Sequence, residues 1–159
     1  MQKYVKPFFE ETELGISPFL NKEFKINVRR GIDLRTFKKV DMQEKPNEYV
    51  YDAGLISKIF IDSEYRLISS GLKSYSQRLL IWILYELDNG KDWLWINKVR
   101  YMEENHLKDM RVYRNAIKDL VKYSFLAVST ITDVYWINPH MFFRGSRVEK
   151  YKDKLNVVK

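Results

Sequence analysis

The chain has 159 residues, a formal net charge of +7 and no cysteine. Without cysteine there can be no disulfide, cysteine-ligated zinc site or thiol nucleophile, and no apolar run approaches the roughly 18 residues that a membrane span needs. The positive charge favours a polyanionic partner, nucleic acid ahead of an acidic membrane, with an ordinary solvated basic surface as the alternative.

Residues 1–71 are predicted to form an extension that contains a β-hairpin. Residues 1–23 should be irregular, because proline and glycine recur in them. Residues 24–40 hold two β-like runs around Arg29-Arg30-Gly31, which predicts a hairpin that breaks at this glycine. Cations cluster here, and a solvated hairpin face explains them better than a β-ribbon contact with DNA. The cluster consists of Arg29, Arg30, Arg35, Lys38 and Lys39.

From about residue 72 the apolar residues follow a helical period. Ser74 and Gln77 have the spacing of a capping box. The sequence Asp88-Asn89-Gly90 is typical of a helix end, because Asn and Gly tolerate the left-handed conformation. An apolar stripe between these signals predicts a helix with one buried face. The stripe consists of Leu79, Leu80, Ile83, Leu84 and Leu87.

A strand, a short helix and a turn are predicted next. Trp93–Ile96 has the composition of a short strand. Asn97 has a side chain that suits the start of a helix over residues 98–104. His106 should then lie in a turn, where a helix-turn-helix usually has glycine.

A second helix and a small hairpin complete the pattern. Asp109 should cap a helix over Met110–Lys122, since its carboxylate accepts first-turn amides and its charge suits the helix dipole. Phe125–Thr130 and Val134–Asn138 should be strands joined by residues 131–133. The order is helix, strand, helix, turn, helix, hairpin. It predicts an α+β fold, with a winged helix-turn-helix over residues 72–143 and a basic tail over residues 144–159.

The helix Met110–Lys122 carries the strongest candidate site. Cations and one amide recur on one face, and apolar residues such as Tyr113, Ile117 and Leu120 lie on another. Arginine can grip guanine bidentately, asparagine can grip adenine, and lysine near the helix end suits phosphate. The alternative is a solvated face whose cations stabilise the C-terminal dipole. The predicted DNA-binding residues of this helix are Arg111, Arg114, Asn115, Lys118 and Lys122.

The C-terminal tail is a second basic segment. Arg144 and Arg147 are predicted to contact DNA, with the following lysines tracking phosphates in a salt-dependent way. A solubilising C-terminal helix is an equally good reading of the same residues.

The sequence gives no sign of an enzyme. The two histidines, His106 and His140, are too far apart to suggest a metal site. No phosphate-binding loop, nucleophile elbow or zinc-protease motif occurs. We therefore expect no catalytic residue, no metal and no cofactor.

The C-terminal half resembles the winged-helix core of RepL-type plasmid replication proteins. The likeness covers about residues 75–150. It rests on the segment YRNAIKDLVKYSFLAV and on an aromatic-x-Ile-Asn-Pro step that is followed by two apolar residues, a basic residue and glycine. The residues of this second motif are Tyr135, Ile137, Asn138, Pro139, Phe142, Phe143, Arg144 and Gly145.

The resemblance implies sequence-specific binding of double-stranded DNA during replication initiation of a plasmid or bacteriophage. It also implies host replication proteins as partners and the bacterial cytoplasm as location. Two alternatives stay open: a winged-helix transcription regulator, and a phage structural or interaction protein that uses the same scaffold. A homodimer is compatible with each, and we expect no membrane partner.

Overall fold

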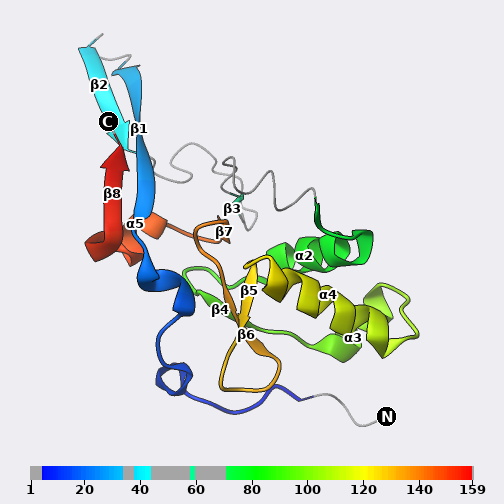
Figure 1. The fold of residues 1–159 in the computed structure, drawn as a ribbon. Helices are drawn as coiled ribbons and strands as arrows, with labels where there is room; N and C mark the ends of the chain where they lie inside the picture. Colours follow the sequence, from blue (N-terminus) through cyan, green and yellow to red (C-terminus); the bar gives the residue numbers. More distant parts are fainter. Residues whose placement is uncertain (1–4, 34–37, 44–57, 60–70, 159) are drawn as a thin grey trace.

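A computed structural model describes residues 5–33, 38–43, 58–59 and 71–158. The fold is α+β, with helices packed on a small antiparallel sheet (Figure 1). Helix α2 packs on α4, and the three strands run in the order β4-β6-β5. The elements of this part are α2 (Ser74–Glu86), β4 (Trp93–Trp95), α3 (Lys98–Glu104), α4 (Met110–Lys122), β5 (Leu126–Val128) and β6 (Val134–Ile137).

The main core lies between α2, α4 and the sheet. Four residues of the predicted stripe are buried, namely Leu79, Leu80, Ile83 and Leu87, and the fifth, Leu84, is partly buried against the same core. They join buried residues of α3, α4 and the strands in one cluster. Burial of this kind is the main favourable term in folding.

The ends of these helices agree with the sequence in two cases of three. The side chains of Asn97 and Asp109 accept first-turn amides of α3 and α4, as predicted. The capping box of α2 is wrong, because the helix starts one residue earlier than that motif requires. Lys73 is the N-cap, Ser74 is already helical, and Gln77 donates to the Leu72 carbonyl at 3.0 Å.

The N-terminal segment covers the face of the β4-β6-β5 sheet that is opposite the main core. Its two short 3-10 helices are η1 (Glu11–Leu14) and η2 (Pro18–Asn21). Leu14 is buried with Trp93, and the ring of Phe9 meets that of Trp93 edge-on at 5.2 Å between centroids. Leu14 and Phe9 therefore anchor this segment on the sheet.

A second sheet pairs a strand from the N-terminal part of the chain with the last strand of the C-terminal part. Strand β1 (Phe24–Asp33) pairs antiparallel with β2 (Lys38–Gln43) and parallel with β8 (Leu155–Val158), and Figure 1 shows this ribbon standing away from α2 and α4. Helices α5 (Arg147–Lys150) and η3 (Lys152–Lys154) precede β8.

The hairpin forms as predicted, but its turn does not lie at Gly31. Gly31 lies inside β1 opposite Val40, and the pairing continues to Asp33 and Lys38. A glycine is tolerated within a strand although it weakens it, so its presence did not mark the turn. Of the predicted basic cluster, Arg35 lies outside the described residues.

Candidate nucleic-acid interface

Helix α4 separates its apolar and basic residues onto two faces. Tyr113, Ala116, Ile117 and Leu120 are buried and face the core. The five candidate residues lie on the opposite, solvent-facing side. Every one of these candidates is exposed, namely Arg111, Arg114, Asn115, Lys118 and Lys122. At about 3.6 residues per turn, they occupy one stripe along the helix. We call it the α4 basic face.

The turn before α4 fixes the direction of this face. His106 has a φ of 54°, in the left-handed region where glycine is the usual choice. Its amide donates to the Glu103 carbonyl at 3.2 Å, and the Leu107 amide donates to the Met102 carbonyl at 2.8 Å. The histidine therefore takes the turn conformation that the sequence pattern requires.

At the start of α4, the Arg111 side chain is paired with the capping residue Asp109. Asp109 Oδ1 accepts the Arg111 amide at 2.9 Å, which caps the helix. The same carboxylate binds the Arg111 guanidinium through Nε and Nη2, at 3.0 and 2.9 Å from Oδ2. These bonds lower the pKa of Asp109 and raise the pKa of Arg111. Both groups are ionised at neutral pH.

The middle of the face consists of Arg114, Asn115 and Lys118. Within the described part of the chain, no hydrogen bond or ion pair holds these three side chains. Lys122 lies with its ammonium 5.3 Å from the centre of the Tyr123 ring. Asp119, also on α4, accepts the Lys73 amide at 3.3 Å, at the start of α2. The face is therefore positive and available to an anion.

Helix α3 differs from α4, because acids neutralise its arginine. Arg100 donates to both carboxylate oxygens of Glu86, at 2.8 and 3.0 Å, and to Glu104 at 2.7 Å. Glu104 also accepts from the Trp82 indole at 2.7 Å. The Trp82 and Arg100 bonds lower the pKa of Glu104. A cation between two acids is a poor phosphate ligand, so this side of α3 does not extend the basic face.

The hairpin of β5 and β6 adds little positive charge. The residues between these strands, 129–133, contain no lysine or arginine. The Lys98 ammonium pairs with Asp133 at 3.4 Å, and the Thr130 hydroxyl donates to the Glu13 carbonyl at 3.2 Å. This tip therefore offers hydroxyls, and the acidic N-terminal segment lies against it.

Arg144 and Arg147 do not lie where the sequence placed them. Both are only 6% exposed. Arg144 Nη2 donates to the carbonyls of Leu84 and Tyr85 at the end of α2, at 2.9 and 3.1 Å. Arg147 Nη1 donates to the Pro139 carbonyl at 3.2 Å. Unpaired carbonyls at a helix end attract cations. These arginines stabilise the fold, and the prediction of an exposed basic tail at these two positions is wrong.

The Asn-Pro motif and the following residues form a structural joint. Asn138 is buried; its amide donates to the Ser124 carbonyl at 2.7 Å, and its Oδ1 accepts the His140 amide at 3.0 Å. Phe142 and Phe143 form β7, which pairs with β3 (Lys58–Ile59). Gly145 has a φ of 111°, and an added Cβ would lie 2.9 Å from Asn89 Oδ1. The second of the two motifs that carry the RepL resemblance thus serves packing in this fold.

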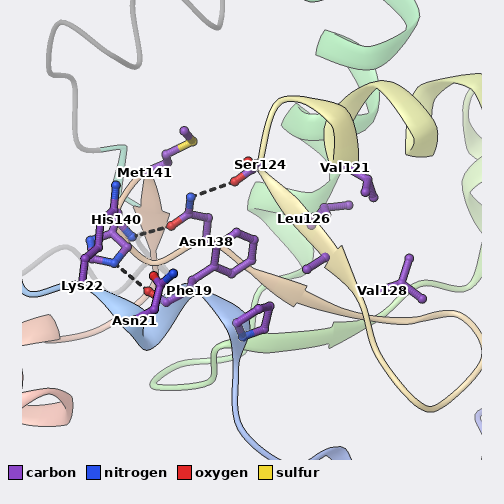
Figure 2. Close-up of a pocket in the computed structure, with 12 residues that line it drawn as sticks. Phe19, Asn21, Lys22, Val121, Ser124, Leu126, Val128, Asn138, His140 and Met141 are labelled. Carbon is purple, nitrogen blue, oxygen red and sulfur yellow. Dashed lines mark hydrogen bonds between the residues drawn. The ribbon is translucent and has the colours of Figure 1, made fainter.

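A hollow of about 550 Å³ opens beside this joint. Figure 2 shows Phe19 and Lys22 on one side of it, Leu126 and Val128 of β5 on the other, and Asn138 hydrogen-bonded to Ser124 and His140. Its lining includes no carboxylate. Sequence reasoning missed this hollow, because it forms only where residues over 100 positions apart meet.

Comparisons with protein-family models, curated proteins and solved structures found no match to this chain. In the described ranges, no helix is long and apolar enough to cross a membrane. The same ranges contain no group of three histidines or acids arranged to hold a metal ion.

Proposed function

We propose that this chain binds double-stranded DNA, with the α4 basic face in the major groove. The observation that carries the proposal is the division of α4 into a buried apolar face and an exposed face of four cations and one amide. A recognition helix needs both, since it must be anchored to the protein while it reaches the bases.

The order of elements supports a winged helix-turn-helix arrangement. In this reading α3 is the first helix of the motif, α4 is the recognition helix, and β5 and β6 form the wing. Asn97 and Asp109 cap the two helices, and His106 makes the turn between them. Helix α4 has 13 residues and is about 20 Å long, which suits a groove about 12 Å wide.

In this proposal, different residues along α4 contact different parts of the DNA. Arg111 and Asn115 lie in the N-terminal half, which in helix-turn-helix proteins meets the base edges. Lys118 and Lys122 lie nearer the C-terminal end, where phosphates are the natural ligands. The wing has no lysine or arginine, and its Thr130 hydroxyl is bonded to the Glu13 carbonyl, so α4 supplies the cationic contacts in this proposal.

We propose replication initiation of a plasmid or phage as the biological role, on the RepL resemblance, with host replication proteins as partners. The alternative is transcription regulation. Footprinting separates them, because an initiator protects an origin and a regulator protects a promoter.

A charge-matched pair of variants tests the proposed face. Arg114→Ala/Lys118→Ala removes two positive charges from α4, and Lys152→Ala/Lys154→Ala removes two from exposed positions in η3. Figure 1 places the flanking elements α5 and β8 at the opposite end of the molecule from α4. We measure the Kd for a mixed-sequence duplex at low salt, and the melting temperature of each protein.

The α4 variant should raise the Kd about tenfold or more, since bonds to charged groups contribute roughly 1.5–3 kcal/mol each. The η3 variant should change it much less, and both should melt like the wild type. Equal losses in the two variants would mean that net charge alone attracts the DNA, which contradicts the proposal.

A further inference from the structure

Asp109 and Arg111 form an arrangement that helix capping alone does not require. Capping uses one bond, from the Arg111 amide to Asp109 Oδ1 at 2.9 Å. The carboxylate makes three further contacts with the guanidinium of the same residue: Nε to Oδ1 at 3.2 Å, Nε to Oδ2 at 3.0 Å, and Nη2 to Oδ2 at 2.9 Å. The arginine side chain is still 82% exposed. It is therefore held in one orientation while it faces solvent.

The position of the carboxylate determines which part of the guanidinium is left for a ligand. A guanidinium has five N–H donors in a fixed planar fork. Asp109 occupies the edge formed by Nε and Nη2. The opposite edge, formed by Nη1 and Nη2, has no partner among the described residues. Two parallel donors on such an edge match the O6 and N7 acceptors of guanine in the major groove.

We propose that Arg111 reads a guanine in the DNA site and that Asp109 is the positioning residue that selects this base. The inference rests on the proposed function. Arg111 lies in the first turn of α4, where a recognition helix approaches the bases. The carboxylate fixes the side chain before binding, so less rotamer freedom is lost in the complex. It also repels phosphates, which disfavours a backbone contact for the same arginine.

Asn115 lies one helical turn after Arg111 on the same face. That separation is about 6 Å along the helix, close to the rise of two base pairs. Asparagine pairs bidentately with adenine N6 and N7. The site that the geometry selects therefore has a guanine with an adenine one or two base pairs away.

Duplexes selected by the intact protein from a random library provide the test. The chosen duplex is then remade with 7-deazaguanine, which lacks the N7 acceptor, at each guanine in turn. We expect one position where this change weakens binding about 10- to 150-fold, the range for losing one hydrogen bond to a charged group. Arg111→Lys should reduce this penalty, because lysine keeps the charge without the planar fork.

Asp109→Asn and Asp109→Ser separate positioning from capping, because Asn and Ser cap helices about as well as Asp. Both should bind unrelated duplexes more tightly, since a negative charge is removed, and both should lose most of the discrimination for guanine. Melting temperatures within a few degrees of wild type would show that the helix is intact.

The outcomes distinguish this inference from the function on which it rests. Duplex binding without any enriched guanine, or unchanged discrimination in Asp109→Asn, would overturn the role of Asp109 and Arg111 alone. Failure of the wild type to bind any duplex at low salt would overturn the proposed function as well.

Discussion

Truncation of Arg144 tests whether the structure has assigned the C-terminal arginines correctly. Arg144→Ala removes two charge-assisted hydrogen bonds, to the carbonyls of Leu84 and Tyr85, from a side chain that is only 6% exposed. These carbonyls belong to the last turn of α2. The substitution leaves them without this donor and removes the packing of the side-chain stem.

The expected loss in the free energy of unfolding is about 2–4 kcal/mol. A bond to a charged group contributes roughly 1.5–3 kcal/mol, and two bonds from one nitrogen are not additive. For a chain of this size, each kcal/mol shifts the melting temperature by about 2–4 °C. We therefore expect a fall of about 4–16 °C.

Thermal melts and duplex titrations on the same samples provide the assay. Lys118→Ala, an exposed change on α4, is the control and should leave stability within about 0.5 kcal/mol while weakening DNA binding. The folded fraction of Arg144→Ala should bind DNA as the wild type does. If Arg144→Ala melted normally and lost DNA affinity, the arginine would be a DNA ligand and our reasoning would be refuted.

Three further predictions concern other parts of the fold. Ile117→Ala should destabilise the protein by about 2–5 kcal/mol, as chemical denaturation would show, because Ile117 is buried between α4 and the core; a neutral effect would mean that α4 is rotated from our description. Asn138→Ala should cost about 2–4 kcal/mol, since it leaves the Ser124 carbonyl and the His140 amide without their partner; a wild-type melting temperature would contradict this. Burial raises the pKa of Asp92 above its ordinary 3.8, and the charge of Lys150 opposes this shift. The folded state therefore holds the Asp92 proton more tightly than the unfolded state does. As a result, the contribution of this group to stability falls as the pH rises past 3.8. Urea titrations from pH 4 to 7 should show that Asp92→Asn, measured against the wild type, gains stability as pH rises, and a relative loss would show that the ion pair with Lys150 outweighs burial.

The sequence predicted the local features of the α2–β6 region well. The caps and ends of α3 and α4 follow from side chains within four residues of each helix. Both strands of the small hairpin form where they were predicted, but β5 is shorter than the predicted Phe125–Thr130. The turn at His106 was also placed correctly, since its spacing between two capped helices left few other options. Local hydrogen bonds and periodicity carry this information.

Long-range partners were the part that sequence reasoning missed. Arg144 and Arg147 looked like a solvated basic tail, yet Arg144 finds the end of α2, 59 and 60 residues earlier in the chain. The parallel pairing of β8 with β1 brings residues such as Leu155 and Phe24 together. The sequence around a basic residue does not show whether its side chain binds a phosphate or the carbonyls of a helix end, because both are oxygen acceptors. Only the fold decides between them.

The most direct test of the central claim is the salt dependence of duplex binding by the wild type and by Lys118→Ala. Binding through the α4 basic face should give a line of log Kobs against log salt with a slope of about −0.9 for each phosphate neutralised. Lys118→Ala should make this slope shallower by about one, and affinity should fall alike for all sequences. A flat line for the wild type, or identical slopes for both proteins, would show that α4 does not hold DNA phosphates and would contradict the account.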